Sequence, residues 1–188
     1  MHPKAGLSEF RDVVEAQRPG VIAIDCSLSW ARSGGSRSCE RAVRALGINI
    51  FNTPTEEVGA THSFYGWIVA GLKALDCAID AGYSVATSAP ITPGSVIEAF
   101  PHATTVALLG SIPPTTKTTR AKKALRASAL HDAGVQIDAN IRLDLLDAAL
   151  AALTGLSALR GDAIAVGDPD EGAIFLPTTG LPDRYVRD

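Results

Sequence analysis

The stretch Val21-Ile22-Ala23-Ile24-Asp25 decides the fold of this chain. Its four apolar residues lie between Arg18-Pro19-Gly20, which ends a helix, and a polar stretch that begins at Cys26. A short apolar run with such boundaries predicts a strand buried on both faces, as in a largely parallel sheet. Asp25 stands at the carboxyl end of this strand, where open α/β sheets bind their ligands. Because a lone buried carboxylate is costly, we expect Asp25 to be paired or to bind a metal ion.

A second carboxylate lies in a predicted helix at about residues 143–159. The apolar stripe of this helix consists of Leu143, Leu146, Leu150 and Leu153. Asp147 falls within the stripe, because residues three and four apart share one helix face. A carboxylate on the inner face of a helix needs a partner, and a cation shared with Asp25 is one candidate. A structural ion pair or a capping role is the alternative.

Length and composition restrict the class of protein. A chain of 188 residues can form one domain with a substantial core. The formal charge of −3 argues against a surface that is basic throughout, although local basic patches remain compatible with it. The three cysteines show no C-x-x-C spacing, which favours a reduced cytoplasmic setting. No apolar stretch reaches membrane-spanning length, and the first residues do not resemble a signal peptide, so we expect a soluble protein without membrane contact.

Hydrophobic periodicity and turn residues predict alternating helices and strands. The predicted helices cover about residues 8–18, 36–46, 61–81, 101–109, 120–133 and 143–159, and the predicted strands cover residues 21–25, 83–88, 95–100 and 173–176. This alternation predicts an α/β fold in a single domain over residues 1–188, with its core at about 21–177. Arg37 is predicted on the outer side of its helix, and Phe64 and Trp67 are predicted to pack in the core.

Four acids are embedded in otherwise apolar predicted elements: Asp25, Glu98, Asp144 and Asp147. Clustered carboxylate oxygens suit Mg²⁺ or Mn²⁺, which bind through one or two carboxylates, waters and substrate phosphates. Two such ions can activate a water for phosphodiester cleavage. Glu98 alternates with apolar residues on its strand, so a position on the solvent face is an equal alternative for it.

A basic cluster follows the prolines at positions 113 and 114. It consists of Lys117, Arg120, Lys122, Lys123 and Arg126. Such a cluster can bind phosphates, although a solvated helix face is the commoner reason for it. The candidate substrate-binding residues are Arg37, Lys117 and Arg120. Few aromatic residues are interleaved with the cations in sequence, so no single-strand stacking platform is predicted here.

Several segments together resemble a widespread family, a domain of unknown function described as predicted RNase H-like nucleases. The segments are Ala23-Ile24-Asp25-Cys26-Ser27-Leu28, Gly35-Ser36-Arg37-Ser38-Cys39-Glu40, Ile97-Glu98-Ala99-Phe100-Pro101-His102-Ala103, Lys117 with Arg120, Asp144-Leu145-Leu146-Asp147-Ala148, and Gly167-Asp168-Pro169-Asp170-Glu171-Gly172-Ala173-Ile174-Phe175-Leu176-Pro177. The resemblance extends from about Val21 to Pro177, in the order of the family. Cys26 and Ser27 stand where the family has Ala-Pro.

The resemblance implies an RNase H-like mixed sheet flanked by helices and a cluster of acids that binds divalent metal. Carried over by position, Asp25 and Asp147 are metal ligands. Asp144, three residues before Asp147, is a further candidate metal ligand. Glu98 is a ligand or a base that positions water, and Lys117 contacts a phosphate. The expected function is metal-dependent hydrolysis of phosphodiester bonds with Mg²⁺ or Mn²⁺, and the expected partner is nucleic acid or a nucleotide.

One departure from the family concerns the beginning of the fold. Proteins of this fold usually start with a glycine-rich strand that ends in an aspartate, followed by two more strands, and these first strands have no counterpart upstream of Asp25. The alternative function is therefore a non-catalytic interaction or nucleotide-binding module that has lost this first acid. An uncovered edge at Val21-Ile22-Ala23-Ile24-Asp25 is a template for another chain, so we also expect a homodimer.

Overall fold

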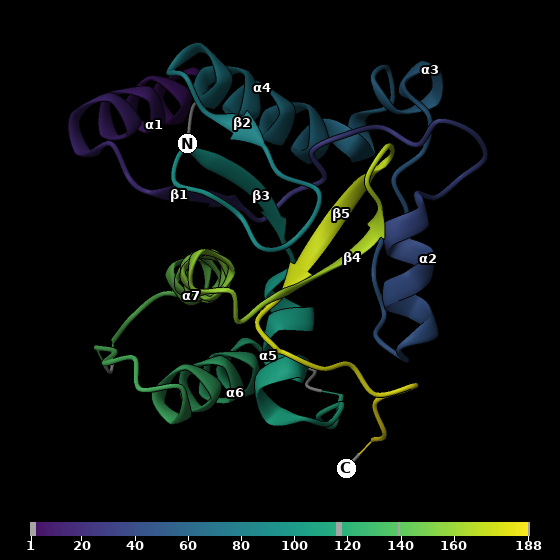
Figure 1. The fold of residues 1–188 in the computed structure, drawn as a ribbon, viewed down its shortest axis with the longest axis vertical. Helices are drawn as coiled ribbons and strands as arrows, with labels where there is room; N and C mark the ends of the chain where they lie inside the picture. The colour runs from purple at the N-terminus through teal and green to yellow at the C-terminus, as the bar shows by residue number, and fades with distance from the viewer. Residues whose placement is uncertain (1–2, 116–117, 139, 188) are drawn as a thin grey trace.

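The computed structural model describes residues 3–115, 118–138 and 140–187, in which a five-stranded sheet is flanked by helices (Figure 1). The strands are β1 (Val21–Ile24), β2 (Ser84–Val85), β3 (Ser95–Ala99), β4 (Ile164–Asp168) and β5 (Gly172–Leu176). The helices are α1 (Pro3–Gln17), α2 (Ser38–Ala45), α3 (Glu56–Gly59), a 3-10 helix η1 (Ser63–Tyr65), α4 (Gly66–Asp80), α5 (Pro101–Leu109), α6 (Thr119–Asp132) and α7 (Leu143–Arg160). None of these helices combines the length and the apolar character needed to cross a membrane.

The sheet is mixed, with the strand order β1-β3-β5-β4. Strand β3 is central and runs parallel to both β1 and β5, whereas β4 and β5 form an antiparallel hairpin. The short strand β2 pairs with the first two residues of β3, and β5 pairs with its last two, so β2 and β5 share one edge of β3. The predicted α/β class with a mixed sheet is therefore confirmed.

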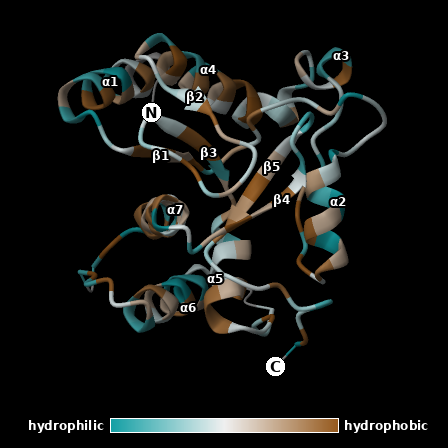
Figure 2. Cartoon of the chain, viewed as in Figure 1, coloured by the Kyte–Doolittle hydropathy of each residue, from teal (hydrophilic) through white to brown (hydrophobic). Residues whose placement is uncertain are grey.

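Alternation along the strands directs apolar side chains to helices on both faces. On one face, Ile22 and Val96 pack against α1 and α4, and Ile174 packs against α2. On the other face, Ile97 and Phe175 pack against the C-terminal half of α7. Figure 2 shows the hydrophobic colouring along β5 and hydrophilic residues on α6, away from the sheet. The sheet is therefore buried between two helical layers, as the apolar strands predicted.

Strand β1 lies at one end of the described sheet. Its partner is β3, and no strand of the described residues lies along its outer edge. Helices α1 and α4 lie on one side of β1, and α7 lies on the other (Figure 1). The outer edge of β1 is thus bordered by helices without being paired to a strand.

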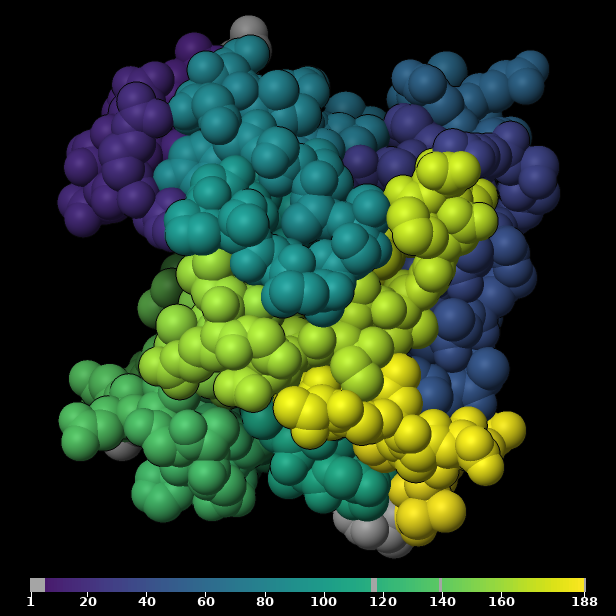
Figure 3. Space-filling view, in the orientation of Figure 1, coloured from purple at the N-terminus to yellow at the C-terminus, as the bar shows by residue number. Residues whose placement is uncertain are grey.

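The C-terminal residues close the opposite part of the molecule. The Tyr185 backbone N–H donates to the carbonyl of Leu46 at 2.9 Å, and the Ile112 N–H donates to the carbonyl of Val186 at 2.7 Å. Tyr185 is itself part of the core cluster around α2 and β5. In the space-filling view the C-terminal segment, in yellow, lies beside α2 and the segment after α5 (Figure 3).

Two sequence predictions about burial are wrong. Arg37, predicted on the outer side of its helix, is fully buried, because it is the N-cap residue of α2 and points toward β3. Phe64 and Trp67, predicted in the core, have exposed fractions of 55% and 42%. They lie at the start of the predicted helix, where η1 and the first turn of α4 extend beyond the sheet.

Two further differences concern the strands. Strand β4 was not predicted, and part of the predicted loop at residues 167–172 belongs to it. Its sequence, Ile-Ala-Val-Gly-Asp, is short and follows a helix directly, so it carries little periodic signal. The predicted strand at 83–88 is reduced to β2, since a proline-containing turn follows it.

Candidate functional site

Asp25 lies at the carboxyl end of β1 and borders two cavities. The first, of about 460 Å³, we call the aromatic cavity; it is lined by Asp25, Cys26, Ser27, Glu40, Ile50, Phe51, Phe64, Trp67, Glu98, Ala99 and Phe100. The second, of about 530 Å³, we call the acidic groove; it is lined by Phe10, Val21, Ala23, Ile24, Asp25, Ala74, Asp144, Asp147, Ala148, Ala151 and Ala152. Contrary to the expected burial, the Asp25 side chain is exposed at this junction, and among the described residues it has no hydrogen-bonding or ion-pair partner.

Asp147 borders the same groove from α7. Its position is half-buried, next to the fully buried Leu146 and Leu150, so the predicted apolar stripe and the inward-facing acid are both present. The Asp147 carboxylate accepts a hydrogen bond from the guanidinium of Arg126 on α6. Asp144, one turn earlier, is exposed and pairs with Arg142 at 2.6 Å. Two of the three acids in the groove therefore already have a cationic partner.

The pKa values of both inner acids are raised by their surroundings. Partial desolvation by the surrounding protein and, second, the negative charge of Asp147 raise the pKa of Asp25 to about 6, although the charge of Arg126 opposes both effects. Burial also raises the pKa of Asp147, although Arg126 lowers it through its charge and its hydrogen bond. A cation between these acids would relieve the repulsion that favours protonation of Asp25.

Glu98, the third sequence-predicted acid, is buried and forms a bidentate ion pair with Arg37. The two guanidinium nitrogens Nη1 and Nη2 donate to Oε2 and Oε1 at 2.7 and 2.6 Å. The Leu28 backbone N–H donates to Oε2 at 2.9 Å. Burial opposes the charged form of Arg37, but the hydrogen bonds and the charge of Glu98 outweigh it and raise the Arg37 pKa. Glu98 is therefore occupied by protein donors, although one wall of the aromatic cavity includes it.

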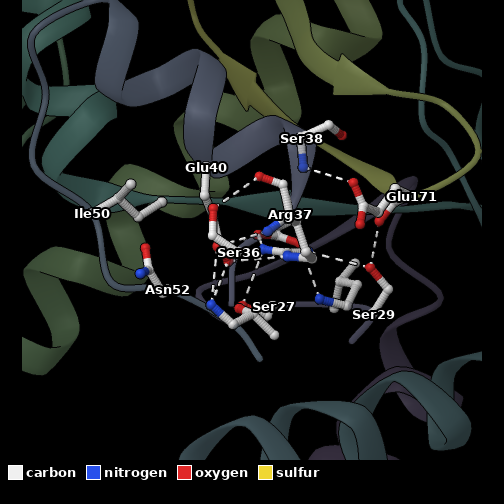
Figure 4. Close-up of polar contacts among 12 residues, drawn as sticks. Ser27, Ser29, Ser36, Arg37, Ser38, Glu40, Ile50, Asn52 and Glu171 are labelled. Atoms are coloured by element: carbon white, nitrogen blue, oxygen red, sulfur yellow. Dashed lines mark hydrogen bonds and ion pairs between the residues drawn. The ribbon is translucent and has the colours of Figure 1, made fainter. Parts of the chain in front are cut away.

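All five N–H donors of the Arg37 guanidinium have acceptors within the protein. Besides Glu98, these are Glu40 Oε1 for Nε at 3.1 Å, Ser29 Oγ for Nη1 at 3.4 Å and Ser27 Oγ for Nη2 at 3.0 Å (Figure 4). No donor is left for a phosphate, so the expected substrate-binding role of Arg37 has no geometric support. The residue instead ties α2 to β3 and to the segment after β1.

Two glutamates complete this buried network, and sequence reasoning assigned neither a role. Glu40 accepts from the backbone N–H of Arg37 at 3.1 Å and of Thr53 at 2.9 Å, and so closes the capping box of α2. Glu171, in the turn between β4 and β5, accepts from the N–H of Ser38 at 2.7 Å (Figure 4). Burial acts against its charged form, but the hydrogen bonds from Arg32 and Ser38 lower the pKa of Glu171. The spacing of Arg37 and Glu40 at a helix start was the available signal for the capping box.

A cationic cavity of about 470 Å³ lies next to the aromatic cavity, with which it shares Ile50, Phe51 and Phe100. Its lining includes four basic side chains: His102, Lys122, Arg126 and Arg187. Burial, assisted by the charges of Arg126 and Lys122, lowers the pKa of His102, so its imidazole is neutral near pH 7. Because Arg126 also contacts Asp147, the cations of this cavity and the acids of the groove are adjacent.

The predicted basic residues are only partly brought together. Lys122 and Arg126 face the cationic cavity, whereas Arg120 is exposed at the start of α6 and outside its lining. Lys117 lies outside the described residues. His102 and Arg187 had not been predicted as site residues; His102 follows Pro101 in a motif that the sequence analysis did quote.

The acidic groove brings carboxylates from β1 and α7 into one lining. In the described ranges no group of three or more His, Cys, Asp or Glu is placed to bind a metal ion. Mg²⁺ needs fewer protein ligands than that, because it commonly binds one or two carboxylates and completes its shell with water and substrate phosphate. Asp25 and Asp147 offer such a pair, and Asp144 lies at the same groove.

A family model described as "Protein of unknown function (DUF429)" matches residues 5–172. Searches of curated proteins and of solved structures gave no match. The matched range includes β1, β3, α7 and β4, and with them Asp25, Glu98 and Asp147. The chain therefore belongs to this family of proteins of unknown function.

Proposed function

We propose that this protein is a metal-dependent, RNase H-like nuclease that hydrolyses phosphodiester bonds at Asp25 and Asp147. The observation that supports the proposal most directly is the shared acidic groove, in which these acids from β1 and α7 lie beside the cations around Arg126. The acids alone would repel the negatively charged phosphate of a phosphodiester, whereas the adjacent cations attract and stabilise it.

The chain's own residues have distinct roles in this proposal. Asp25 and Asp147, with Asp144 nearby, bind Mg²⁺ or Mn²⁺. Bound there, the metal would lower the pKa of a water and stabilise the negative charge that develops on the phosphate. Arg126, together with Lys122, orients a phosphate from the cationic cavity. We retain Lys117 and Arg120 as proposed phosphate contacts.

Glu98 has an indirect role. Its hydrogen bonds to Arg37 and to the Leu28 N–H fix the segment that follows Asp25. It therefore positions the carboxyl end of β1, and neither metal binding nor base catalysis at Glu98 is needed.

A non-catalytic nucleotide-binding or interaction module is the second candidate. It is favoured by the ion pair of Glu98 with Arg37, which takes Glu98 out of the acid cluster that the resemblance implied. Such a module would bind the same anions without hydrolysing them.

We also propose a homodimer that forms along the outer edge of β1, and a reducing, cytoplasmic setting. The dimer is supported by the apolar residues beside this edge in the acidic groove. The setting is supported by the buried free thiols of Cys26, Cys39 and Cys77.

The test of hydrolysis compares Asp25→Asn and Asp147→Asn with Asp132→Asn. Asp132 lies at the end of α6 with 67% of its side chain exposed, which makes it a matched control. We expect Mn²⁺ binding by calorimetry and cleavage of labelled oligonucleotides in the wild type and in the control. Each site variant should lose at least about 100-fold in cleavage rate, as expected when a charge-stabilising group is removed. Mn²⁺ binding without cleavage would support the non-catalytic module, and equal activity in all variants would exclude this site.

A further inference from the structure

Three exposed aromatic residues of the aromatic cavity and a half-buried tyrosine beside them form a distinct surface feature, which we call the aromatic platform: Phe51, Phe64 and Trp67, with Tyr65 packed against Phe64. The exposed fraction of Phe51 is 69% and that of Phe64 is 55%. Their ring centroids are 6.3 Å apart at an angle of 64°, and those of Phe64 and Tyr65 are 5.0 Å apart at 88°. Phe64 contacts both Phe51 and Tyr65, yet Phe51, Phe64 and Trp67 leave much of their area in water, which the burial of apolar surface does not explain.

The loop that carries Phe51 is fixed even though its ring is exposed. Arg44 of α2 donates to the carbonyl of Ile50 at 3.2 Å and to Asn52 Oδ1 at 2.5 Å, on either side of Phe51. Asn52 and Ile50 lie beside the start of α2 in Figure 4. The next residue, Thr53, is fully buried and is anchored by Glu40. The platform is therefore pre-organised before any ligand binds.

Phe51 stands where three cavities meet. It borders the aromatic cavity, the cationic cavity, and a more open polar cavity of about 1010 Å³ that includes Arg41, Arg44, Phe64 and Tyr65. Cations therefore lie on both sides of the platform: Arg41 on one side, and Lys122, Arg126 and Arg187 on the other. Exposed rings between two groups of cations are complementary to a chain with negative charges and flat apolar groups.

We propose that the aromatic platform stacks bases of a single-stranded nucleic acid, whose phosphates contact the flanking cations. The inference rests on the proposed nuclease function and specifies its substrate class. A duplex keeps its bases stacked inside the helix and offers no free face to Phe51, whereas a single strand does. A strand stacked here would pass from Arg41 over the platform into the cationic cavity, beside the Arg126–Asp147 pair.

This substrate class was not predicted because the aromatic and basic residues are separated in the sequence. Phe51 and Phe64 lie well before the basic helix, and folding brings them to the same cavities. A docking surface for a protein partner would use the same exposed rings, but the cations on both sides favour a polyanion.

The experiment measures binding without cleavage. Fluorescent oligothymidylate and oligouridylate of about 12 nucleotides, within the range of known single-strand sites, are titrated in EDTA by anisotropy. The variants are Phe51→Ala, Phe51→Leu and Phe64→Ala, and Leu156→Ala is the control, because Leu156 is also an exposed apolar residue but lies on α7. We expect each Phe variant to weaken binding about 10-fold, since base–aromatic stacking contributes about 1–3 kcal/mol per base. Phe51→Leu separates stacking from simple apolar contact, because it keeps the bulk and removes the ring.

A spectroscopic readout supplements the titration. The chain has two tryptophans, so Trp30→Phe leaves Trp67 of the platform as the only one. Binding of oligothymidylate to this variant should quench its fluorescence, whereas a blunt duplex of the same length should quench it much less.

The possible outcomes separate this inference from the proposed function. Weaker binding by the Phe variants, together with loss of cleavage in Asp25→Asn and Asp147→Asn, supports both. Normal single-strand binding by the platform without any cleavage in Mn²⁺ supports the platform and contradicts the nuclease. Unchanged affinity in Phe51→Ala and Phe64→Ala, or equal affinity for duplex, overturns the platform whether or not cleavage occurs. Loss of self-association in these variants without nucleic-acid binding would also overturn it, in favour of a protein contact.

Discussion

The Arg37–Glu98 pair is the residue-scale feature that most affects any mutational study of this site. A carboxylate near Asp25 in a predicted nuclease would ordinarily be mutated to test catalysis. Glu98 has at most 6% of its side chain exposed and compensates a fully buried guanidinium. Loss of activity after its substitution would therefore report folding as much as chemistry.

We expect Glu98→Gln to lower the free energy of unfolding by about 3–5 kcal/mol, because it leaves the buried charge of Arg37 without its main partner. Chemical denaturation measures the change, and Glu57→Gln, at an exposed position of α3, is the control. A loss below about 1 kcal/mol, the level of a surface ion pair, would contradict the structural assignment. Glu98 would then again be a candidate metal ligand or general base.

At the scale of elements, the position of Asp25 depends on how closely α4 approaches β1. Gly71 of α4 packs against Cys26, and a Cβ atom at Gly71 would overlap with the Cys26 Sγ. Cys26 also contacts the α4 backbone through its thiol, which lies 3.5 Å from the carbonyl of Trp67. A larger residue at Gly71 must therefore displace the segment that begins at Asp25.

Gly71→Ala should destabilise the protein by about 1–3 kcal/mol, the usual cost of overpacking a core contact. The matched control is Gly66→Ala at the first position of the same helix, where a Cβ has no atom within 4 Å. The control should be neutral or slightly stabilising, because alanine is the better helix former. Thermal unfolding of the two variants makes the comparison, and equal melting temperatures would show that α4 adjusts without cost.

The sequence predicted those elements whose signal is local. The apolar run of β1 and the leucine stripe of α7 are sufficient to place both elements, and with them the two acids that line the groove, Asp25 and Asp147. Strand β4 has five residues and no periodic pattern, so it was not predicted from the sequence.

Features that depend on distant pairing were not predictable in this way. An arginine at a helix start normally faces water, and only the partner Glu98, 61 residues away, makes burial of Arg37 favourable. Likewise, helical spacing could not reveal that Phe64 and Trp67 extend beyond the sheet. Metal binding and catalysis remain predictions.

At the scale of the whole molecule, β1 and β4 are the two ends of the described four-strand order, and the outer edge of β1 is the one beside the acidic groove. The acidic groove runs beside it and is lined by small apolar residues of α7, including Ala148, Ala151 and Ala152. Small side chains leave space for an added strand, and free backbone groups at a sheet edge bind other strands readily. A second copy can pair β1 with its own β1 about a two-fold axis, which satisfies both edges at once.

We therefore expect the wild-type protein to sediment as a dimer at micromolar concentration. Ala148→Glu should shift it to monomer, because it places a charge at an exposed position of the groove next to Asp144 and Asp147. Ser128→Glu, exposed on α6 and outside the groove, adds the same charge and should remain dimeric. A wild-type protein that sediments as a monomer at every concentration would refute the dimer. If both variants remain dimeric, the dimer contact lies elsewhere on the surface. The β1 edge would then be free to bind a chain other than a second copy of this protein.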